Sequence, residues 1–158
     1  MMTIRLKTAA DDARLMPLWT GHFGSSVVVS RGRVHDARDL DGFVAEEGGV
    51  LLGAATFAPG GSGMEIVTLD SVVEDRGAGA ALLEAVTERA REAGMRRLWL
   101  VTTNDNIRAI RFYQKRGWDL CALHRDAVAQ ARKLKPKIPL LGNDGIPILH
   151  EIEFERLL

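Results

Sequence analysis

The feature that most constrains this chain is a glycine-rich junction between a strand and a helix. Residues 66–73 form a strand-like apolar run, and a helical pattern begins directly after it, near Gly77. Gly77 and Gly79 let the backbone approach a ligand closely at a helix start, where N–H groups are free and the positive end of the helix dipole points outward. Arg76 adds a guanidinium at the same place. The junction therefore indicates an anion-binding loop suited to a pyrophosphate.

This Gly-x-Gly turn is not specific by itself, because short glycine loops often only reverse the chain. It lacks the third glycine of a Rossmann fingerprint and the Gly-Lys-Ser/Thr of a Walker loop. A helix is predicted from Gly77 to Ala93 and ends at Gly94, and residues 97–103 then form a near-continuous apolar strand, which is typical of a sheet centre. A strand–helix–strand unit of this length makes its two strands parallel.

The remaining pattern predicts a mixed α/β (α+β) fold, with a single layer of strands flanked by helices. Antiparallel strands come first, the parallel pair next and a closing hairpin last. Further strands are expected over residues 3–7, 43–46, 49–57, 64–73, 118–123 and 150–157. Helices are expected after Asp11 or Asp12, from Asn104 or Asp105 to Gly117, and over residues 126–134.

Several segments are less regular. Pro17 is expected to shorten or kink the first helix. Residues 27–29 are β-prone but isolated, which fits either a strand or a packed loop. Residues 32–41 are charged and expected to be irregular or briefly helical, while residues 59–63 and 136–147 are predicted loops.

Composition sets the size and the class. The chain has 158 residues with 46% hydrophobic content, enough for one domain over residues 1–158 with a substantial core. Its 21 basic and 21 acidic residues balance, which argues against a nucleic-acid partner. The single cysteine, Cys121, has no disulfide partner, and the sequence has neither a signal-peptide core nor a membrane-spanning stretch. We therefore expect a cytoplasmic protein without a membrane partner.

Residues 104–118 supply a second and more specific pattern. They contain Asn106, Ala109, Phe112-Tyr113 and Gly117-Trp118. Together with the glycine junction, this resembles the GNAT N-acetyltransferase superfamily. The family's pyrophosphate loop reads Gln/Arg-x-x-Gly-x-Gly/Ala, which this chain matches except at its first position, Glu74. The family's later helix reads Asn-x-x-Ala-x-x-Phe-Tyr-x-x-x-Gly-Phe/Trp, which this chain matches throughout. The likeness covers residues 49–123.

The resemblance implies an enzyme that moves an acetyl group from acetyl-CoA to a primary amine of a small molecule or peptide by direct attack. In that fold the two central parallel strands splay apart, and the pantetheine arm lies between them. No metal is expected. The residues implied in binding acetyl-CoA are Ser71, Val72 and Val73 for pantetheine, Arg76, Gly77, Ala78, Gly79, Ala80 and Ala81 for pyrophosphate, and Asn106, with Asn104 as a neighbouring candidate.

Tyr113 is the only tyrosine, and it matches the family residue that donates its phenolic proton to the departing thiolate. A phenol with an ordinary pKa near 10 is protonated at neutral pH and able to donate. Asn106 and Tyr113 are seven residues apart, so they share one helix face and lie about 10 Å apart along the axis. The alternative for Tyr113 is a purely structural core aromatic.

The base that accepts the amine proton is left open. Family members often use a carboxylate on the strand before the glycine loop, where this chain has Glu65 and Asp70. Strict alternation puts these two on opposite faces, so at most one faces the cleft. For either, surface solvation or a structural hydrogen bond is the alternative. His22, His35 and His150 are further candidates, and an amine that arrives deprotonated needs no base.

The acceptor site is expected near Trp19, His22 and Phe23 and the loop before the last strand. The basic run of Arg132, Lys133, Lys135 and Lys137 either attracts an acidic substrate or the 3′-phosphate of CoA, or forms a solvated helix end. Two other functions stay open at this point: a non-catalytic acyl-CoA-binding or sensing module, and a structural domain without a ligand. A homodimer is left open as well.

Overall fold

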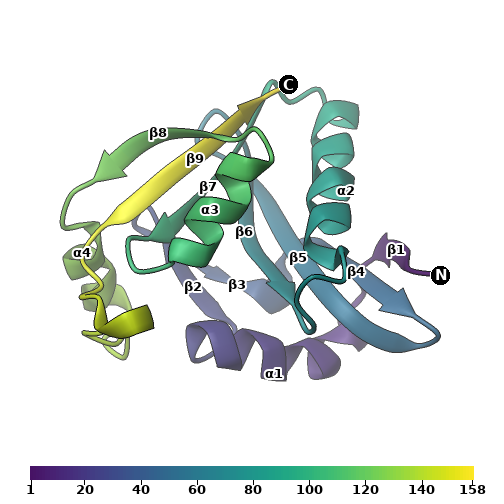
Figure 1. The fold of residues 1–158 in the computed structure, drawn as a ribbon, viewed down its shortest axis with the longest axis horizontal. Helices are drawn as coiled ribbons and strands as arrows, with labels where there is room; N and C mark the ends of the chain where they lie inside the picture. Colours follow the sequence, from purple (N-terminus) through teal and green to yellow (C-terminus); the bar gives the residue numbers. More distant parts are fainter.

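The computed structural model describes residues 1–158 and contains a seven-stranded mixed sheet with four α-helices (Figure 1). The strands lie in the order β1-β4-β5-β6-β7-β9-β8, and β2 and β3 form a separate hairpin. The strands are β1 (Thr3–Leu6), β2 (Val27–Ser30), β3 (Arg33–Asp36), β4 (Asp41–Glu47), β5 (Val50–Gly60), β6 (Gly63–Ser71), β7 (Arg97–Thr103), β8 (Asp119–His124) and β9 (Glu151–Leu157). The helices are α1 (Asp12–Phe23), α2 (Ala78–Glu92), α3 (Ile107–Lys115) and α4 (Ala127–Leu134).

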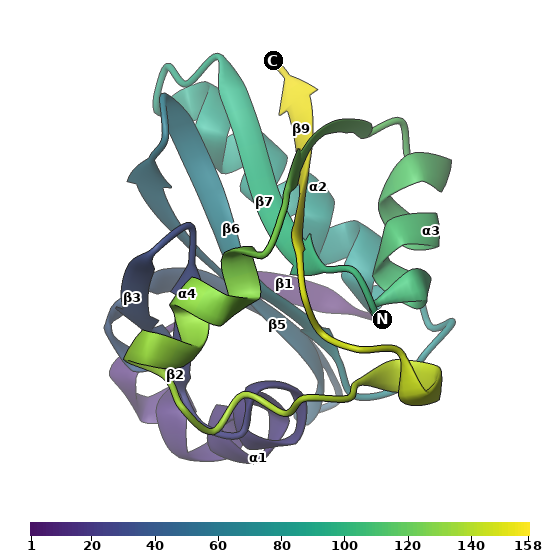
Figure 2. The ribbon, with the colours of Figure 1, turned by 90° about the vertical axis from the view of Figure 1, so that its left-hand side faces the viewer.

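Helices cover both faces of the sheet. Helices α2 and α3 lie on one face, and α1 with the β2–β3 hairpin lies on the other (Figure 2). The larger core joins Leu82 of α2 to Ile66 of β6 and Phe154 of β9. A smaller core packs Leu15 and Trp19 of α1 against β4 and β5. The mixed, single-layer sheet with flanking helices that the sequence predicts is therefore confirmed.

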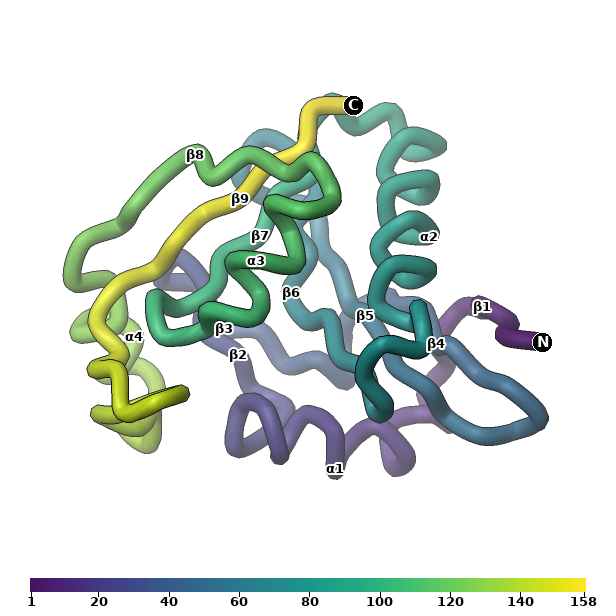
Figure 3. Tube along the Cα trace, in the orientation of Figure 1, coloured from purple at the N-terminus to yellow at the C-terminus, as the bar shows by residue number.

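The two central strands separate along their length. Strands β6 and β7 are parallel, as predicted, but they pair only at Met64 with Leu98 and at Glu65 with Trp99. Strand β7 instead pairs over its whole length with β9, and β6 keeps its pairing with β5. The trace in Figure 3 follows β6 towards the start of α2 and β7 towards the start of α3. Strands β6 and β7 are thus paired at the beginning of β6, which we call the closed end, and separate at the end of β6, which we call the open end.

A β-bulge in β6 overturns the alternation expected for its two carboxylates. Thr68 pairs with Thr56 and Ile66 pairs with Phe57, so the intervening Val67 has no partner of its own. One extra residue shifts the side-chain alternation by one position. Glu65 and Asp70 therefore lie on the same face, towards α1 and the β2–β3 hairpin. The prediction that they lie on opposite faces is wrong.

The irregular segments differ most from the sequence expectations. Residues 27–30 and 33–36 form a hairpin whose turn residues, Arg31 and Gly32, both have positive φ, so the charged stretch holds a strand as well as a short 3-10 turn. Strand β5 reaches Gly60, which reduces the expected loop at 59–63 to a tight turn. Pro17 lies inside a helix of 12 residues, so it does not shorten α1. No helix is both long and apolar enough to cross a membrane.

Candidate active site

The glycine junction forms the start of α2 at the open end of β6. Gly77 is the N-cap and has a left-handed backbone, with φ of 80°. The first helical hydrogen bond runs from the Ala81 N–H to the Gly77 carbonyl, at 3.0 Å. The N–H groups of Ala78, Gly79 and Ala80 therefore have no partner inside the helix. These free donors and the helix dipole form a site for an anion.

Gly79 is the residue at which this site is tightest. A Cβ atom built there lies 3.3 Å from Ser71 Oγ and 3.4 Å from Phe112 Cζ. The helix start thus packs against the end of β6 on one side and α3 on the other. A large side chain at this position would clash with Ser71 and Phe112.

The charged residues around the junction are paired with each other. Arg76 Nη2 lies 2.9 Å from Glu47 Oε2, and Glu74 Oε2 lies 2.5 Å from Arg108 Nη1 on α3. All four side chains are well exposed. Glu74, the departure from the family loop, therefore has a cation partner that offsets its charge beside the anion site.

The edge of β6 beyond its pairing with β7 is available to an extended ligand. The Val72 N–H donates to the Leu52 carbonyl at 2.8 Å, so this residue points its backbone towards β5. Backbone direction alternates along a strand, which turns the polar groups of Ser71, the last residue of β6, towards the gap. The side chains of Val72 and Val73 are both about half exposed. Of the three predicted pantetheine contacts, Ser71 thus offers backbone groups, and Val72 and Val73 offer apolar surface.

Tyr113 lies on α3 and packs into the larger core. Its ring contacts Phe112, Trp118 and Phe154, with ring centroids between 5.2 and 5.6 Å apart. The hydroxyl forms no hydrogen bond within the protein. Burial, and secondarily the charge of Asp70, raises the pKa of Tyr113 above its ordinary value. The phenol therefore keeps its proton through the neutral range, and this proton is free for a ligand.

The two asparagines before α3 have structural contacts. Asn106, rather than Asn104 or Asp105, caps the helix: its Oδ1 accepts from the Ala109 N–H at 3.2 Å. Its Nδ2 donates to Thr102 Oγ1 at 3.1 Å. Asn104 binds the backbone of residues 147–150, through Nδ2 to the Pro147 carbonyl and through Oδ1 to the N–H groups of residues 149 and 150. Contact of either asparagine with a cofactor stays a prediction.

Glu65 lies at the closed end of the β6–β7 pair and is sealed from solvent. Its side chain is 1% exposed. The Ser30 hydroxyl donates to Oε2, and His35 Nε2 lies 3.3 Å from Oε1. Burial raises the pKa of Glu65 to about 7, and burial lowers the pKa of His35. Glu65 is therefore a buried carboxyl with a raised pKa, and its side chain is not accessible to a substrate.

Asp70 lies at the open end and forms a pair with His22 that the sequence does not reveal. Asp70 Oδ1 is bonded to His22 Nδ1 at the end of α1. The Asp70 side chain is 2% exposed, whereas that of His22 is 49% exposed. Asp70 Oδ2 is buried without a partner. Such an arrangement resembles the base-and-orienter pairs of other enzymes, in which a carboxylate fixes the tautomer of an imidazole.

Other residues proposed from the sequence have structural contacts. Trp19 is fully buried in the smaller core, so it is not exposed to an acceptor. In the basic run, Lys135 Nζ donates to the carbonyls of Phe23 and Val27, and Arg132 donates to the carbonyls of residues 138, 139 and 148. These two cations hold loops together rather than extending into solvent.

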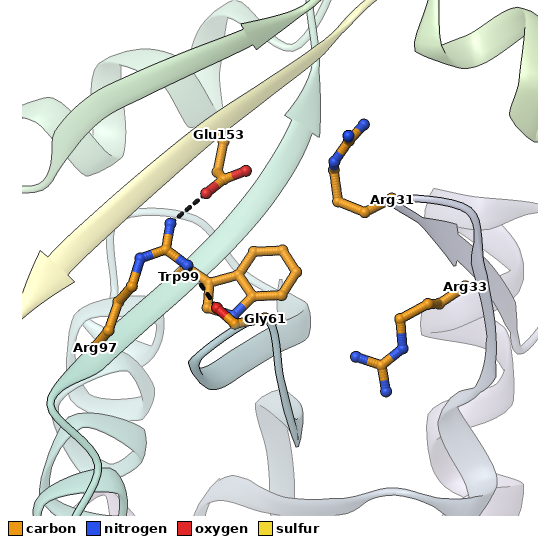
Figure 4. Close-up of a pocket in the computed structure, with 6 residues that line it drawn as sticks. All are labelled: Arg31, Arg33, Gly61, Arg97, Trp99 and Glu153. Carbon is orange, nitrogen blue, oxygen red and sulfur yellow. Dashed lines mark hydrogen bonds and ion pairs between the residues drawn. The ribbon is translucent and has the colours of Figure 1, made fainter.

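A separate cavity of about 220 Å³ lies at the closed end of the sheet (Figure 4). Its six lining residues are Arg31, Arg33, Gly61, Arg97, Trp99 and Glu153. Arg97 pairs with Glu153 and Glu155, and Arg31 Nη1 lies 3.1 Å from Glu151 Oε1. Most of the positive charge in this cavity is therefore neutralised within the protein. No group of three or more His, Cys, Asp or Glu side chains is arranged to hold a metal ion.

The comparisons with known proteins agree with this geometry. The model of the acetyltransferase (GNAT) family matches residues 12–118. Two Bacillus subtilis (strain 168) proteins described as uncharacterized are similar in sequence: YdhI is 41% identical over 145 residues, 91% of each chain, and YxbD is 42% identical over 132 residues, 83% of each chain. The chain therefore belongs to the acetyltransferase (GNAT) family, as the sequence resemblance implies.

Solved structures share the fold at lower sequence identity. An IAA acetyltransferase from Bacillus cereus ATCC 14579 superposes over the full length of both chains, with a TM-score of 0.79 at 19% identity. A GNAT family acetyltransferase from Elizabethkingia anophelis, solved with acetyl-CoA bound, has a TM-score of 0.72 at 18% identity, covering 99% of this chain and 98% of its own.

Proposed function

We propose that this protein is an acetyl-CoA-dependent N-acetyltransferase that acetylates a primary amine of a small molecule or peptide by direct attack. The observation that carries the proposal is the opening between β6 and β7 beside the free N–H groups of α2. A strand edge next to an anion site suits a ligand that has amide groups at one end and a diphosphate at the other. Membership of the acetyltransferase family and fold relatives with acetyl-CoA or CoA bound support the same ligand.

The residues at the open end fit acetyl-CoA. Ala78, Gly79 and Ala80 would bind the diphosphate through backbone N–H groups. The backbone of Ser71 would bind an amide of the pantetheine arm, and Val72 and Val73 would contact the arm with their side chains. Gly79 has no side chain, so the start of the helix packs closely against Ser71 and Phe112. When bound, acetyl-CoA supplies an activated acetyl group as a thioester.

Tyr113 is the general acid in this proposal. Its protonated hydroxyl has no partner within the protein, so it is free to donate to the sulfur as the carbon–sulfur bond breaks. Its ring is held by three aromatic neighbours, which fixes the direction of the hydroxyl without an internal hydrogen bond. Tight positioning of this kind contributes to catalysis because little reorganisation accompanies the reaction.

The test has two stages. Thermal melting with and without coenzyme A comes first, because a ligand that binds only the folded state raises the melting temperature by mass action. A panel of amino acids, polyamines, arylalkylamines, aminosugars and short peptides is then incubated with acetyl-CoA, and released thiol is measured. Stabilisation with amine-dependent thiol release supports the enzyme. Stabilisation without release favours a non-catalytic acyl-CoA-binding or sensing module, and no stabilisation contradicts both.

A further inference from the structure

The end of α1 brings an imidazole to the open end of β6. His22 is the last but one residue of α1, and its Nδ1 is bonded to Asp70 Oδ1. Its other ring nitrogen, Nε2, has no hydrogen-bond partner within the protein, and half of the side chain is exposed. Asp70 is buried at the strand end that leads into the glycine junction, and its charge reaches Tyr113 from there. The imidazole and the buried carboxylate therefore lie together at the open end of β6, and the charge of the carboxylate acts on the phenol.

We propose that His22 is the base of the acetyl transfer and that Asp70 is its positioning residue, an inference that rests on the proposed function. Nε2 of His22 accepts the proton that the amine nitrogen loses, and Asp70 accepts the Nδ1–H bond that holds the ring in the required tautomer.

The other candidate bases are excluded by their contacts. Glu65 is sealed and bonded to Ser30, and His35 is buried beside it. His150 Nδ1 already accepts the Asp126 N–H at 2.9 Å, and His124 Nε2 lies 2.8 Å from Glu153 Oε1. Asp70 itself is almost fully buried, so it reaches an amine only through His22. Of the four histidines, only His22 combines a free ring nitrogen with a carboxylate partner at the opening.

The step balances in atoms and charge. The amine nitrogen forms a bond to the acetyl carbon and gives one proton to His22 Nε2, while Tyr113 gives one proton to the sulfur as the carbon–sulfur bond breaks. His22 and Tyr113 return to their starting charges by proton exchange with water. The net reaction converts an amine and a thioester into an amide and a thiol, with no further reactant.

The surroundings of His22 set the expected pH dependence. The bond to Asp70 raises the pKa of His22 above its ordinary value of 6.5, burial opposes this, and the charges of Asp70 and Glu74 add to it. A base works in its deprotonated form, so activity should rise with pH through that raised pKa. Removing the charge of Asp70 should move the rise to lower pH.

The experiment measures kcat/KM against pH for an amine that the wild-type protein acetylates, together with the Kd for coenzyme A. His22→Gln should lower kcat by about 10²-fold or more, with an unchanged Kd, and should lose the ascending limb. Asp70→Asn should shift that limb to lower pH, a change that a merely structural role does not produce. Added imidazole should partly restore the activity of His22→Ala. His124→Gln, which alters a histidine paired to Glu153 on the β8–β9 pair, is the matched control and should keep wild-type activity.

The outcomes separate this inference from the proposed function. If the wild type acetylates an amine and His22→Gln keeps its turnover or its ascending limb, His22 is not the base although the enzyme assignment stands. If the wild type acetylates no amine, the proposed function fails and the role of His22 fails with it. Should His22→Gln fold poorly, the imidazole rescue of His22→Ala decides, and absence of rescue overturns the inference.

Discussion

The two ends of β6 carry similar buried carboxylates in different surroundings. At the closed end, Glu65 is next to the paired residues of β7 and is enclosed by Ser30 and His35. At the open end, Asp70 has no β7 neighbour and is bonded to the half-exposed His22. Burial raises the pKa of both carboxyls. A perturbed pKa therefore does not identify a catalytic residue here, and access to the opening distinguishes the two.

The comparison also explains how one strand serves two purposes. Pairing between β6 and β7 at its beginning fixes the two halves of the sheet relative to each other. Loss of pairing after Glu65 leaves backbone groups free, and unpaired strand groups are ready to bind another extended chain. Unpaired backbone groups at the outer edge of a sheet promote aggregation. Between the two central strands of this sheet, the same groups form a candidate ligand site.

The largest effect is expected at the open end. Tyr113→Phe should lower kcat by about 10²- to 10³-fold, because it removes the proton donated to the sulfur. The Kd for coenzyme A should change by less than about twofold, since the ring still fills its place in the core. Steady-state kinetics and calorimetry measure the two quantities. Because the hydroxyl has no internal hydrogen bond, the melting temperature should stay the same, and near-wild-type turnover would remove Tyr113 from the mechanism.

Substitution of Glu65, at the closed end, should change the stability of the protein and not its activity. Glu65 has a pKa of about 7 in the folded protein, against an ordinary value of 4.5. Between these values the folded state holds a proton that the unfolded chain has lost, so the free energy of unfolding falls as pH rises from 4.5 to 7. Glu65→Gln should remove this fall and be more stable than the wild type at pH 8, by up to about 3 kcal/mol.

Urea unfolding at several pH values measures the effect at Glu65. Ser30→Ala is the matched variant with the opposite effect. It removes a hydrogen bond that lowers the pKa of Glu65, so this pKa should rise further. The fall in the free energy of unfolding should then begin at the same pH and become larger. If the free energy of unfolding varies with pH in the same way for the wild type and Glu65→Gln, the pKa of this carboxyl does not differ between the folded and unfolded states.

Binding of coenzyme A should be most sensitive at the glycine junction. Gly79→Glu should weaken binding by about 100-fold, which is about 2.7 kcal/mol, because it places bulk and negative charge at the helix start. Gly79→Ala is the size control, and its Cβ contacts of 3.3 and 3.4 Å predict a much smaller loss. Undiminished affinity of the glutamate variant in calorimetry would contradict the pyrophosphate assignment.

The smallest effect is expected at the surface pair next to the junction. Glu74→Gln restores a family residue and removes a negative charge near the bound diphosphate, but it also breaks an exposed ion pair with Arg108. Exposed charges are screened, so coenzyme A binding should strengthen by only about two- to threefold at low salt. The gain should disappear at about 1 M salt, and a gain that persists there would contradict an electrostatic cause.

The sequence predicts the parts of the fold that depend on local pattern. The glycine junction, the helix after it and the apolar strand at residues 97–103 each have a continuous local signal, and their arrangement follows from the handedness and length of the connection. Strand β3 is not predicted because Val34 is its only apolar residue, which leaves no apolar alternation, and because its hairpin depends on the positive φ of Arg31 and Gly32.

The candidate site is predicted only in part. Tyr113 and the loop residues follow from motifs, whereas the partnership of His22 with Asp70 joins residues 48 apart in sequence and depends on how α1 crosses the sheet. The faces of Glu65 and Asp70 are predicted wrongly because a bulge is set by the partner strand and has no clear signal within β6 itself.

The hydrogen bonds of Asn104 have a consequence for the segment that follows it. It binds the backbone of residues 147–150, so one side chain joins the residue after β7 to the residues before β9. The segment between these two points contains α3, β8 and α4. We therefore expect changes in the length or composition of the segment after α3 to leave the β7–β9 register and the start of α3 in place.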